Sequence, residues 1–326
     1  MLRSFPDDCV NAVVTSPPYF HQRDYETNDE RAIGSEKTVE QYIEALMPTF
    51  RECARVLRED GSIFFNLGDK YDNGSLLMIP WLFASRASHE TGLKLINQIT
   101  WVKPNPQPRQ FKRRLVSATE PVFHFVKSDN YRYFPDRFLE GEKYTRPVRD
   151  YRKGHIGEGY FRLIDRSMLT PEQKERARQE LSAVIREVHD GKIWSFRMKV
   201  RGIHSAAYGG YEGGRKLHIE KKGFTILRMF DRPMKRDVID TPIIQDKFVN
   251  HPAMFPSTLV RECLNLTTET DDVVLDPFLG SGTTAITAKE MGRHFVGIDL
   301  NSAYCEVARK RLASTKVQPT LFQYVV

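Results

Sequence analysis

The chain has 326 residues, 40% of them hydrophobic, and a formal net charge of +7 at pH 7. This length and apolar content allow one large core with an inserted module, and the positive charge suits a polyanionic partner. No apolar run of about 18 residues and no signal-peptide core are present, which predicts a cytoplasmic protein without membrane spans. The cysteines lack paired spacing, so we expect neither a metal site nor a disulfide framework: they are Cys9, Cys53, Cys263 and Cys305.

A short apolar run at residues 12–15 ends in an unusual tetrapeptide, Ser16-Pro17-Pro18-Tyr19. The prolines fix φ and remove two backbone donors, and the residue before each proline favours extended geometry. The loop is therefore stiff, with carbonyls that can accept hydrogen bonds. Such oxygens beside a flat ring suit a planar substrate with an exocyclic amino group. The alternative interpretation is a proline strand terminator above a packed tyrosine.

Regular elements are predicted after this loop. An apolar face at helical spacing predicts a helix over 36–57, and Ser62–Leu67 reads as a buried strand ending at Gly68-Asp69. Asp69 is interpreted either as a pocket residue or as a turn cap. A further helix is expected over 76–91, and strands over 96–102 and 120–126. These two strands flank a proline-rich basic loop, interpreted as a phosphate contact or as a solvated loop; its cations are Lys103, Arg109, Lys112, Arg113 and Arg114.

Strand–helix alternation disappears from about 128 to 246, where Arg, Lys, Tyr and Gly interleave. One clear helix is predicted over 171–189, with Thr170 as its N-cap. Cations in the glycine-containing loops, including Arg152 and His155, suit contacts to base edges in a major groove. An insert that serves oligomerisation is the alternative.

Order returns near 248, where a helix is expected with Ser257 as its candidate cap, followed by a strand over 273–275. That strand leads into a glycine loop, residues 276–284, with the sequence Asp-Pro-Phe-Leu-Gly-Ser-Gly-Thr-Thr. A helix over 285–291 and a strand over 295–298, ending at Asp299, complete a βαβ unit. We expect a last helix over 302–314.

The glycine loop lacks the lysine of a phosphate loop and the third glycine of a dinucleotide site. A nucleoside cofactor with an ammonium, a carboxylate and a ribose is a better fit. Asp276 would take the ammonium, the loop and helix N-terminus the carboxylate, and Asp299 the ribose hydroxyls. S-adenosylmethionine has these groups. A purely structural glycine turn is the alternative, disfavoured by the two acidic strand ends.

Together, the tetrapeptide and the glycine loop resemble the catalytic and methionine-binding motifs of the amino-methylating DNA methyltransferases. The catalytic motif comes first, which is the permuted order called the β group. The resemblance implies an α/β, Rossmann-like, circularly permuted methyltransferase fold. Its catalytic half would span 1–127 and its cofactor-binding half 247–326, around an irregular target-recognition insert over 128–246. The form with Ser16 is most typical of cytosine-N4 enzymes, since adenine-N6 members more often carry Asp or Asn there.

The resemblance also implies roles for individual residues. The catalytic residues would be Ser16, Pro17, Pro18 and Tyr19, and the cofactor residues Asp276, Phe278, Gly280, Gly282, Thr283, Thr284 and Asp299, with His251 and Pro256 closing over the methionine end. Ser16 and the Pro17 carbonyl would hold the amine of a flipped base stacked on Tyr19, for in-line methyl transfer followed by proton loss to water.

Double-stranded DNA is the implied partner, in a prokaryotic, nucleoid-associated protein with a restriction-modification or epigenetic role. A cognate restriction endonuclease and a second copy in a homodimer are further implied partners. The alternatives are adenine-N6 methylation, methylation of RNA or of a protein amide, and an inactive DNA-binding protein. Family members of this order usually begin with a strand that is missing here before the helix expected near 2–6. We expect the tail, residues 320–326, to fill that gap; a chain whose start lies upstream is the alternative.

Overall fold

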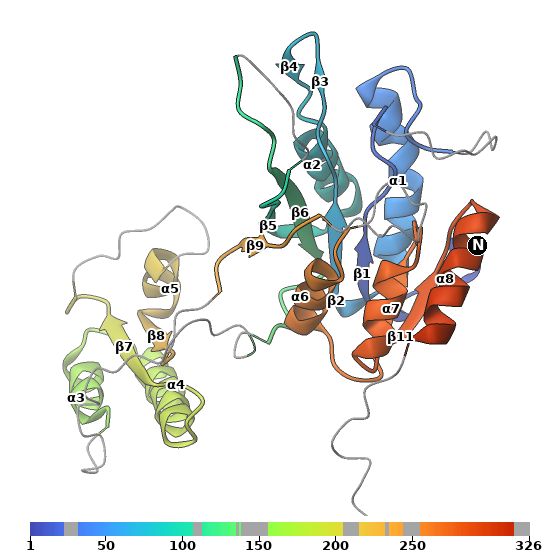
Figure 1. The fold of residues 1–326 in the computed structure, drawn as a ribbon. Coiled ribbons are helices and arrows are strands. Elements are labelled where there is room, and N and C mark those ends of the chain that lie inside the picture. Colours follow the sequence, from blue (N-terminus) through green and yellow to red (C-terminus); the bar gives the residue numbers. More distant parts are fainter. Residues whose placement is uncertain are drawn as a thin grey trace, which may run out of the picture. The chain divides into compact units, whose positions relative to one another are not determined.

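The computed structural model describes residues 1–22, 32–106, 113–134, 137, 156–204, 215–231, 235–243 and 255–315. It divides the chain into two compact units (Figure 1). Unit 1 combines residues 1–137 with 236–326, and unit 2 comprises 138–235. Unit 2 therefore interrupts unit 1 in the sequence. It is shorter at both ends than the insert expected over 128–246, because residues 128–137 and 236–246 belong to unit 1.

Unit 1 is built on a seven-stranded sheet in the order β11-β10-β1-β2-β6-β5-β9. The strands are β11 (His294–Gly297), β10 (Val273–Asp276), β1 (Val10–Thr15), β2 (Leu57–Asn66), β6 (Thr119–Val126), β5 (Lys94–Val102) and β9 (Val238–Asp240). β1 pairs in parallel with both β10 and β2, whereas β6 runs antiparallel to β2 and β5. The carboxyl ends of β1 and β10 therefore meet at one edge, although they are far apart in sequence.

Helices cover both faces of this sheet (Figure 1). α1 (Val39–Val56) and α2 (Ile79–Thr91) contribute to one core cluster, and α6 (Ser257–Thr267) and α7 (Thr283–Glu290) to the other. The central strands alternate between the two clusters, because successive side chains of a strand point to opposite faces. Val13 and Phe65 lie in the first cluster, and Val14 and Phe64 in the second. α8 (Ser302–Ser314) follows β11 as expected.

Several boundaries differ from the expected ones. A short hairpin, β3 (Tyr71–Asp72) with β4 (Ser75–Leu76), occupies the start of the helix expected over 76–91. The N-terminal helix is only a single 3₁₀ turn, Leu2–Ser4. The cap assigned to Ser257 was wrong: Ser257 is the first helical residue, and Pro256 precedes it without a side-chain cap.

Unit 2 has its own small core and more regular structure than expected. It contains α3 (Glu158–Arg166), α4 (Pro171–His189), β7 (Ser195–Val200), α5 (Arg215–Lys222) and β8 (Phe224–Met229), with β7 and β8 forming an antiparallel pair. Leu181, Met198 and Phe224 belong to the cluster that joins helices to strands. The predicted N-cap is confirmed, since the Thr170 hydroxyl accepts from Gln173 N in a capping box.

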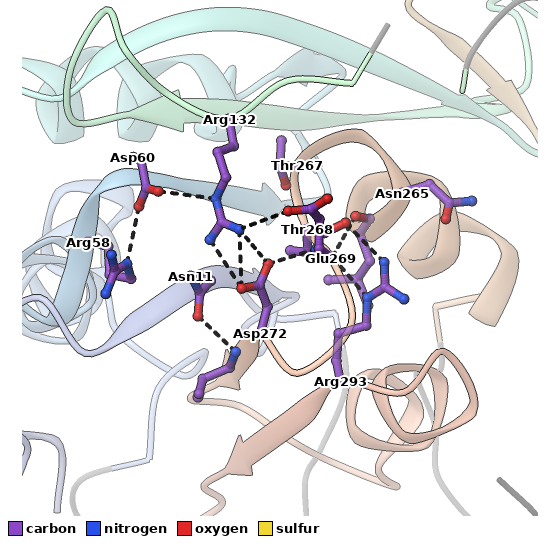
Figure 2. Close-up of polar contacts among 12 residues, drawn as sticks. Asn11, Arg58, Asp60, Arg132, Asn265, Thr267, Thr268, Glu269, Asp272 and Arg293 are labelled. Carbon is purple, nitrogen blue, oxygen red and sulfur yellow. Dashed lines mark hydrogen bonds and ion pairs between the residues drawn. The ribbon is translucent and has the colours of Figure 1, made fainter. Parts of the chain in front are cut away.

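A polar cluster joins the two halves of unit 1 at the amino ends of the strands (Figure 2). The Arg132 guanidinium forms a two-pronged ion pair with Asp272, just before β10, and a second ion pair with Asp60 in β2. Asp272 also accepts from Glu269 N at 2.7 Å, which closes the turn after α6. Arginine forks of this kind fix orientation as well as attraction. The cluster thus holds residues 236–326 against residues 1–137 at the edge opposite to the carboxyl ends of β1 and β10.

Some expectations lie outside the described residues: those for Arg109, Lys112, Arg152, His155, His251 and the tail strand over 320–326. Within the described part of the chain, no helix is both long and apolar enough to cross a membrane. None of the four cysteines forms a disulfide.

Candidate active site

A cavity of about 650 Å³ opens in unit 1, where the carboxyl ends of β1, β10 and β11 meet. Both halves of the chain line it. The tetrapeptide contributes Ser16, Pro17, Pro18 and Tyr19, and the segment after β10 contributes Phe278, Gly280, Thr283 and Asp299. Ligands of open α/β sheets bind at this edge. The structure thus brings together the two motifs that the sequence separates by more than 250 residues.

Asp299 lies at the cofactor side of the cavity and organises the glycine loop. One carboxylate oxygen accepts from Gly280 N at 2.8 Å and the other from Asn301 N at 2.8 Å. Burial raises the pKa of this carboxyl above its usual range, and the two backbone hydrogen bonds oppose that rise. Asp299 is therefore a fixed acceptor at the end of β11, where hydroxyl groups of a ligand are well placed to donate.

Asp276 lies beneath the glycine loop rather than on the cavity surface. Its side chain is 1% exposed, and one carboxylate oxygen accepts from Thr15 Oγ1 at 2.6 Å and from Phe278 N at 3.0 Å. Burial raises the pKa of Asp276 to about 6, and these hydrogen bonds partly oppose the rise. The other oxygen, Oδ2, is buried without a hydrogen-bond partner in the described part of the chain. Asp276 thereby connects Thr15, the residue before the tetrapeptide, to the glycine loop.

Three other predicted cofactor residues also lie away from the cavity lining. Gly282 is the N-cap residue of α7, at φ +92°, and a Cβ there would approach Ala308 Cβ to 2.9 Å, so it permits close packing of α8. The Thr284 hydroxyl donates to the Val14 carbonyl at 3.2 Å and so ties α7 to β1. Pro256 occupies the N-cap position of α6, and its neighbour Phe255 lines the cavity instead.

The prolines of the tetrapeptide offer different carbonyls. Tyr42 in α1 donates its hydroxyl proton to the Pro18 carbonyl at 2.7 Å. No hydrogen bond from the described residues reaches the Pro17 carbonyl, and Pro17 lines the cavity. An incoming donor would therefore find the Pro17 oxygen and the Ser16 hydroxyl, which is the pair predicted from the sequence.

Tyr19 is held firmly at two points. Its ring packs against Gly68, where a Cβ would come within 2.4 Å of the ring carbon Cε2. Its hydroxyl contacts Asn66 Oδ1 at 2.8 Å, Glu120 Oε2 at 2.9 Å and Ser16 Oγ at 3.2 Å. The ring is thus positioned as a platform before any ligand arrives, as a stacking surface requires.

Sequence reasoning missed Glu120 as a site residue and placed Lys103 differently. Both side chains line the cavity, at 15% and 13% exposure, and they form an ion pair in which Lys103 also lies over the Trp101 ring. The expected phosphate contact would need Lys103 to leave this pair. Glu120 reaches the site because β6 runs antiparallel, so its first residues lie beside the end of β2.

The remaining described candidates lie outside this cavity. Asp69 accepts from Lys70 N and from Ile79 N, which makes it the turn cap before α2. Arg114 stacks its guanidinium 3.6 Å from the centre of the Tyr71 ring. Arg113 is exposed and remains available to a polyanion.

A doubly covered sheet with a glycine loop opening a helix at this edge defines an α/β enzyme that binds a nucleoside cofactor. A family model described as a DNA methylase of the N6/N4 type matches residues 10–310. The chain therefore belongs to the N6/N4 family of DNA methylases.

Relatives agree with this assignment, and solved structures share the fold. The type II methyltransferase M.XycI of Xanthomonas campestris pv. cyanopsidis is 27% identical over 96% of this chain and 84% of its own length. The type II methyltransferase M.SfiI of Streptomyces fimbriatus is 29% identical over 93% of this chain and 86% of its own length. The cytosine-N4-specific PvuII DNA methyltransferase shares the fold with a TM-score of 0.57 at 17% identity, over 97% of this chain and 84% of its own. A Thermus thermophilus protein described as a DNA modification methylase, solved with S-adenosyl-L-methionine, has a TM-score of 0.50 at 21% identity, over 96% of this chain and 88% of its own. The predicted methyltransferase fold is confirmed.

Proposed function

We propose that this protein transfers a methyl group from S-adenosylmethionine to the exocyclic N4 amine of cytosine in duplex DNA. The observation that carries the proposal is the single cavity lined by both Ser16-Pro17-Pro18-Tyr19 and the glycine loop. Family membership supports amino methylation of DNA. The choice of cytosine rests on Ser16, because adenine-specific members more often carry Asp or Asn at that position. The type II names of the relatives support a role in restriction-modification.

The cavity residues fit this cofactor. Asp299 would accept from ribose hydroxyls, and Phe278 would supply an apolar surface. The N-terminus of α7, which begins at Thr283 beside the cavity, would attract the carboxylate. The buried Asp276 Oδ2 without a hydrogen-bond partner among the described residues fits a nearby ammonium, although Asp276 lies beneath the lining. When bound, the cofactor supplies an electrophilic methyl group on sulfur.

The protein's own groups would position the amine. The nitrogen of cytosine N4 is a poor nucleophile because its lone pair is delocalised into the ring. Ser16 Oγ and the Pro17 carbonyl would accept hydrogen bonds from its two N–H groups and so turn the lone pair out of the ring plane. Tyr19 would stack on the base, which must leave the duplex to enter the cavity; one such stacking contact contributes about 1–3 kcal/mol. Orientation of this kind lowers the barrier without covalent chemistry.

We further propose that unit 2 carries target recognition and that the exposed Arg113 contacts the DNA backbone. A cognate restriction endonuclease and a homodimer remain proposals by analogy with the family.

The test is to incubate the protein with unmethylated plasmid DNA and S-adenosylmethionine, digest the DNA to nucleosides and identify the product by mass spectrometry. We expect N4-methyldeoxycytidine, and its loss in the Ser16→Ala variant. N6-methyldeoxyadenosine instead would show that the base assignment is wrong. The proposal as a whole would be overturned if the protein bound S-adenosylmethionine in a calorimetric titration but produced no methylated nucleoside from any DNA.

A further inference from the structure

A chain of hydrogen bonds leads from the catalytic hydroxyl to a carboxylate at the back of the cavity. Ser16 Oγ lies 3.2 Å from the Tyr19 hydroxyl, which lies 2.9 Å from Glu120 Oε2 and 2.8 Å from Asn66 Oδ1. The other Glu120 oxygen pairs with Lys103. Hydrogen-bonded chains in a low-dielectric setting strengthen one another. The amine-positioning role proposed above uses neither Glu120 nor Lys103, yet both are largely buried at the cavity wall.

The donor and the acceptor of each hydrogen bond in this series follow from the chemistry of the side chains. Asn66 donates its amide N–H to the Pro121 carbonyl at 3.1 Å, so its oxygen must face Tyr19. An ionised Glu120 also only accepts. The single phenol proton of Tyr19 therefore goes to Asn66 or Glu120, and the bond between Ser16 and Tyr19 must have Ser16 as donor. Ser16 is left with lone pairs for the incoming amine, which matches the acceptor role proposed for it.

The same series of hydrogen bonds connects the reacting nitrogen to a base, the Glu120 carboxylate. When the bond from nitrogen to the methyl carbon forms and the bond from that carbon to sulfur breaks, the nitrogen holds a positive charge and one surplus proton. Ser16 is too weak a base to keep that proton, but it can accept it while passing its own proton onward. A carboxylate is the nearest anionic acceptor that the chain reaches.

We propose that Glu120 takes up the proton that the target amine loses, and that the proton reaches it through Ser16 and Tyr19. This inference rests on the proposed function. The amine proton moves to Ser16 Oγ, the Ser16 proton to Tyr19, and the Tyr19 proton to Glu120 Oε2. The step leaves a neutral methylated amine, neutral Ser16 and Tyr19, and a protonated Glu120. Lys103 holds the Glu120 carboxylate in place, and the proton leaves to solvent when the product departs.

Two isosteric variants separate proton transfer from orientation. Glu120→Gln retains the shape and hydrogen bonding of the side chain, so Ser16 still donates to Tyr19, but it removes the base. Tyr19→Phe retains the stacking ring and removes the link. Glu90→Gln is the matched control, because Glu90 lies on α2 in surface ion pairs with Arg51 and Arg86.

The measurement is the single-turnover rate of methyl transfer from labelled S-adenosylmethionine to a DNA duplex that the wild-type protein methylates. We expect both variants to slow transfer by about 10²-fold, the double variant to be no slower than Tyr19→Phe, and the affinities for DNA and for S-adenosylmethionine to stay unchanged. In Glu120→Ala, sodium formate should restore part of the rate and sodium chloride should not.

Transfer at the wild-type rate in Glu120→Gln would overturn the inference. So would a loss explained by weaker DNA or cofactor binding, or an absence of formate rescue. If the wild-type protein itself methylated no DNA, the proposed function would fail instead, so the two failures are distinguishable.

Discussion

Replacing Gly68 by alanine should impair catalysis by displacing the Tyr19 ring. Gly68 has no positive φ, so its backbone accepts alanine. The new Cβ, however, would lie 2.4 Å from Tyr19 Cε2 and 2.6 Å from Cδ2, whereas ordinary contact begins near 3.4 Å. The ring edge must therefore move by about 1 Å, against hydrogen bonds that anchor its hydroxyl to Asn66 and Glu120. A misplacement of about 1 Å can cost about 10²-fold in rate.

The assay is single-turnover methyl transfer, with cofactor binding measured by calorimetry and stability by thermal melting. We expect Gly68→Ala to transfer about 10²-fold more slowly, to bind S-adenosylmethionine normally and to lose about 1–3 kcal/mol of stability through overpacking. Gly159→Ala is the control, because its Cβ meets nothing within 4 Å. If the clash acts through Tyr19 alone, the Gly68→Ala substitution should not slow methyl transfer further in a protein that already carries Tyr19→Ala. A slower double variant, or full activity in Gly68→Ala, would refute the reasoning.

Three further predictions concern stability. Burial lowers the pKa of His124 to about 3, so between pH 6.5 and 3 only the unfolded chain takes up the proton. The free energy of unfolding should therefore fall by about 1.4 kcal/mol per pH unit below 6.5, and urea titrations of His124→Gln should show a shallower fall. Asp276, with a pKa raised to about 6, behaves oppositely, because its folded form favours the proton. Relative to the wild type, Asp276→Asn should thus gain about 3 kcal/mol in free energy of unfolding as pH rises from 4 to 7. An equal difference in melting temperature between variant and wild type at pH 4 and at pH 7 would contradict this. Arg132→Met leaves Asp272 without its arginine partner and should cost about 3 kcal/mol at unchanged methyl-transfer rate, whereas the exposed Arg86→Met should cost under about 1 kcal/mol. Similar denaturant midpoints for the two variants would count against a stabilising role of the polar cluster in Figure 2.

The elements that sequence predicted well are those whose signals are local. The run before Ser16, the glycine loop and the capped helix after Thr170 each carry their evidence within about a dozen residues. The hairpin of unit 2 also has a local signal, the alternation of Phe196, Met198 and Val200. Interleaved charges in the surrounding segment concealed it.

The roles that sequence missed depend on tertiary contacts. Glu120 reads as the start of an ordinary strand, and only the antiparallel direction of β6 brings it beside Tyr19. Asp276 was expected to bind the ammonium of the cofactor. One of its carboxylate oxygens also accepts from the Thr15 hydroxyl beneath the loop, a contact that the sequence did not indicate. No pattern within either motif could indicate that hydrogen bond, since its partners are 261 positions apart.

That bond explains how a permuted chain assembles one site. β1 belongs to the first half and β10 to the second, yet they are neighbours in the sheet with Val13 opposite Leu275. The hydrogen bonds from Thr15 to Asp276 and from Thr284 to Val14 tie the strand ends directly beneath the two motifs. The positions of Ser16 and the glycine loop are therefore set by a parallel strand pair in the interior of the sheet. An insert can then interrupt the sequence between them without disturbing the geometry, because both hydrogen bonds join residues of unit 1. The site depends on the pairing of β1 with β10 and not on chain order, which is why the tetrapeptide can come first.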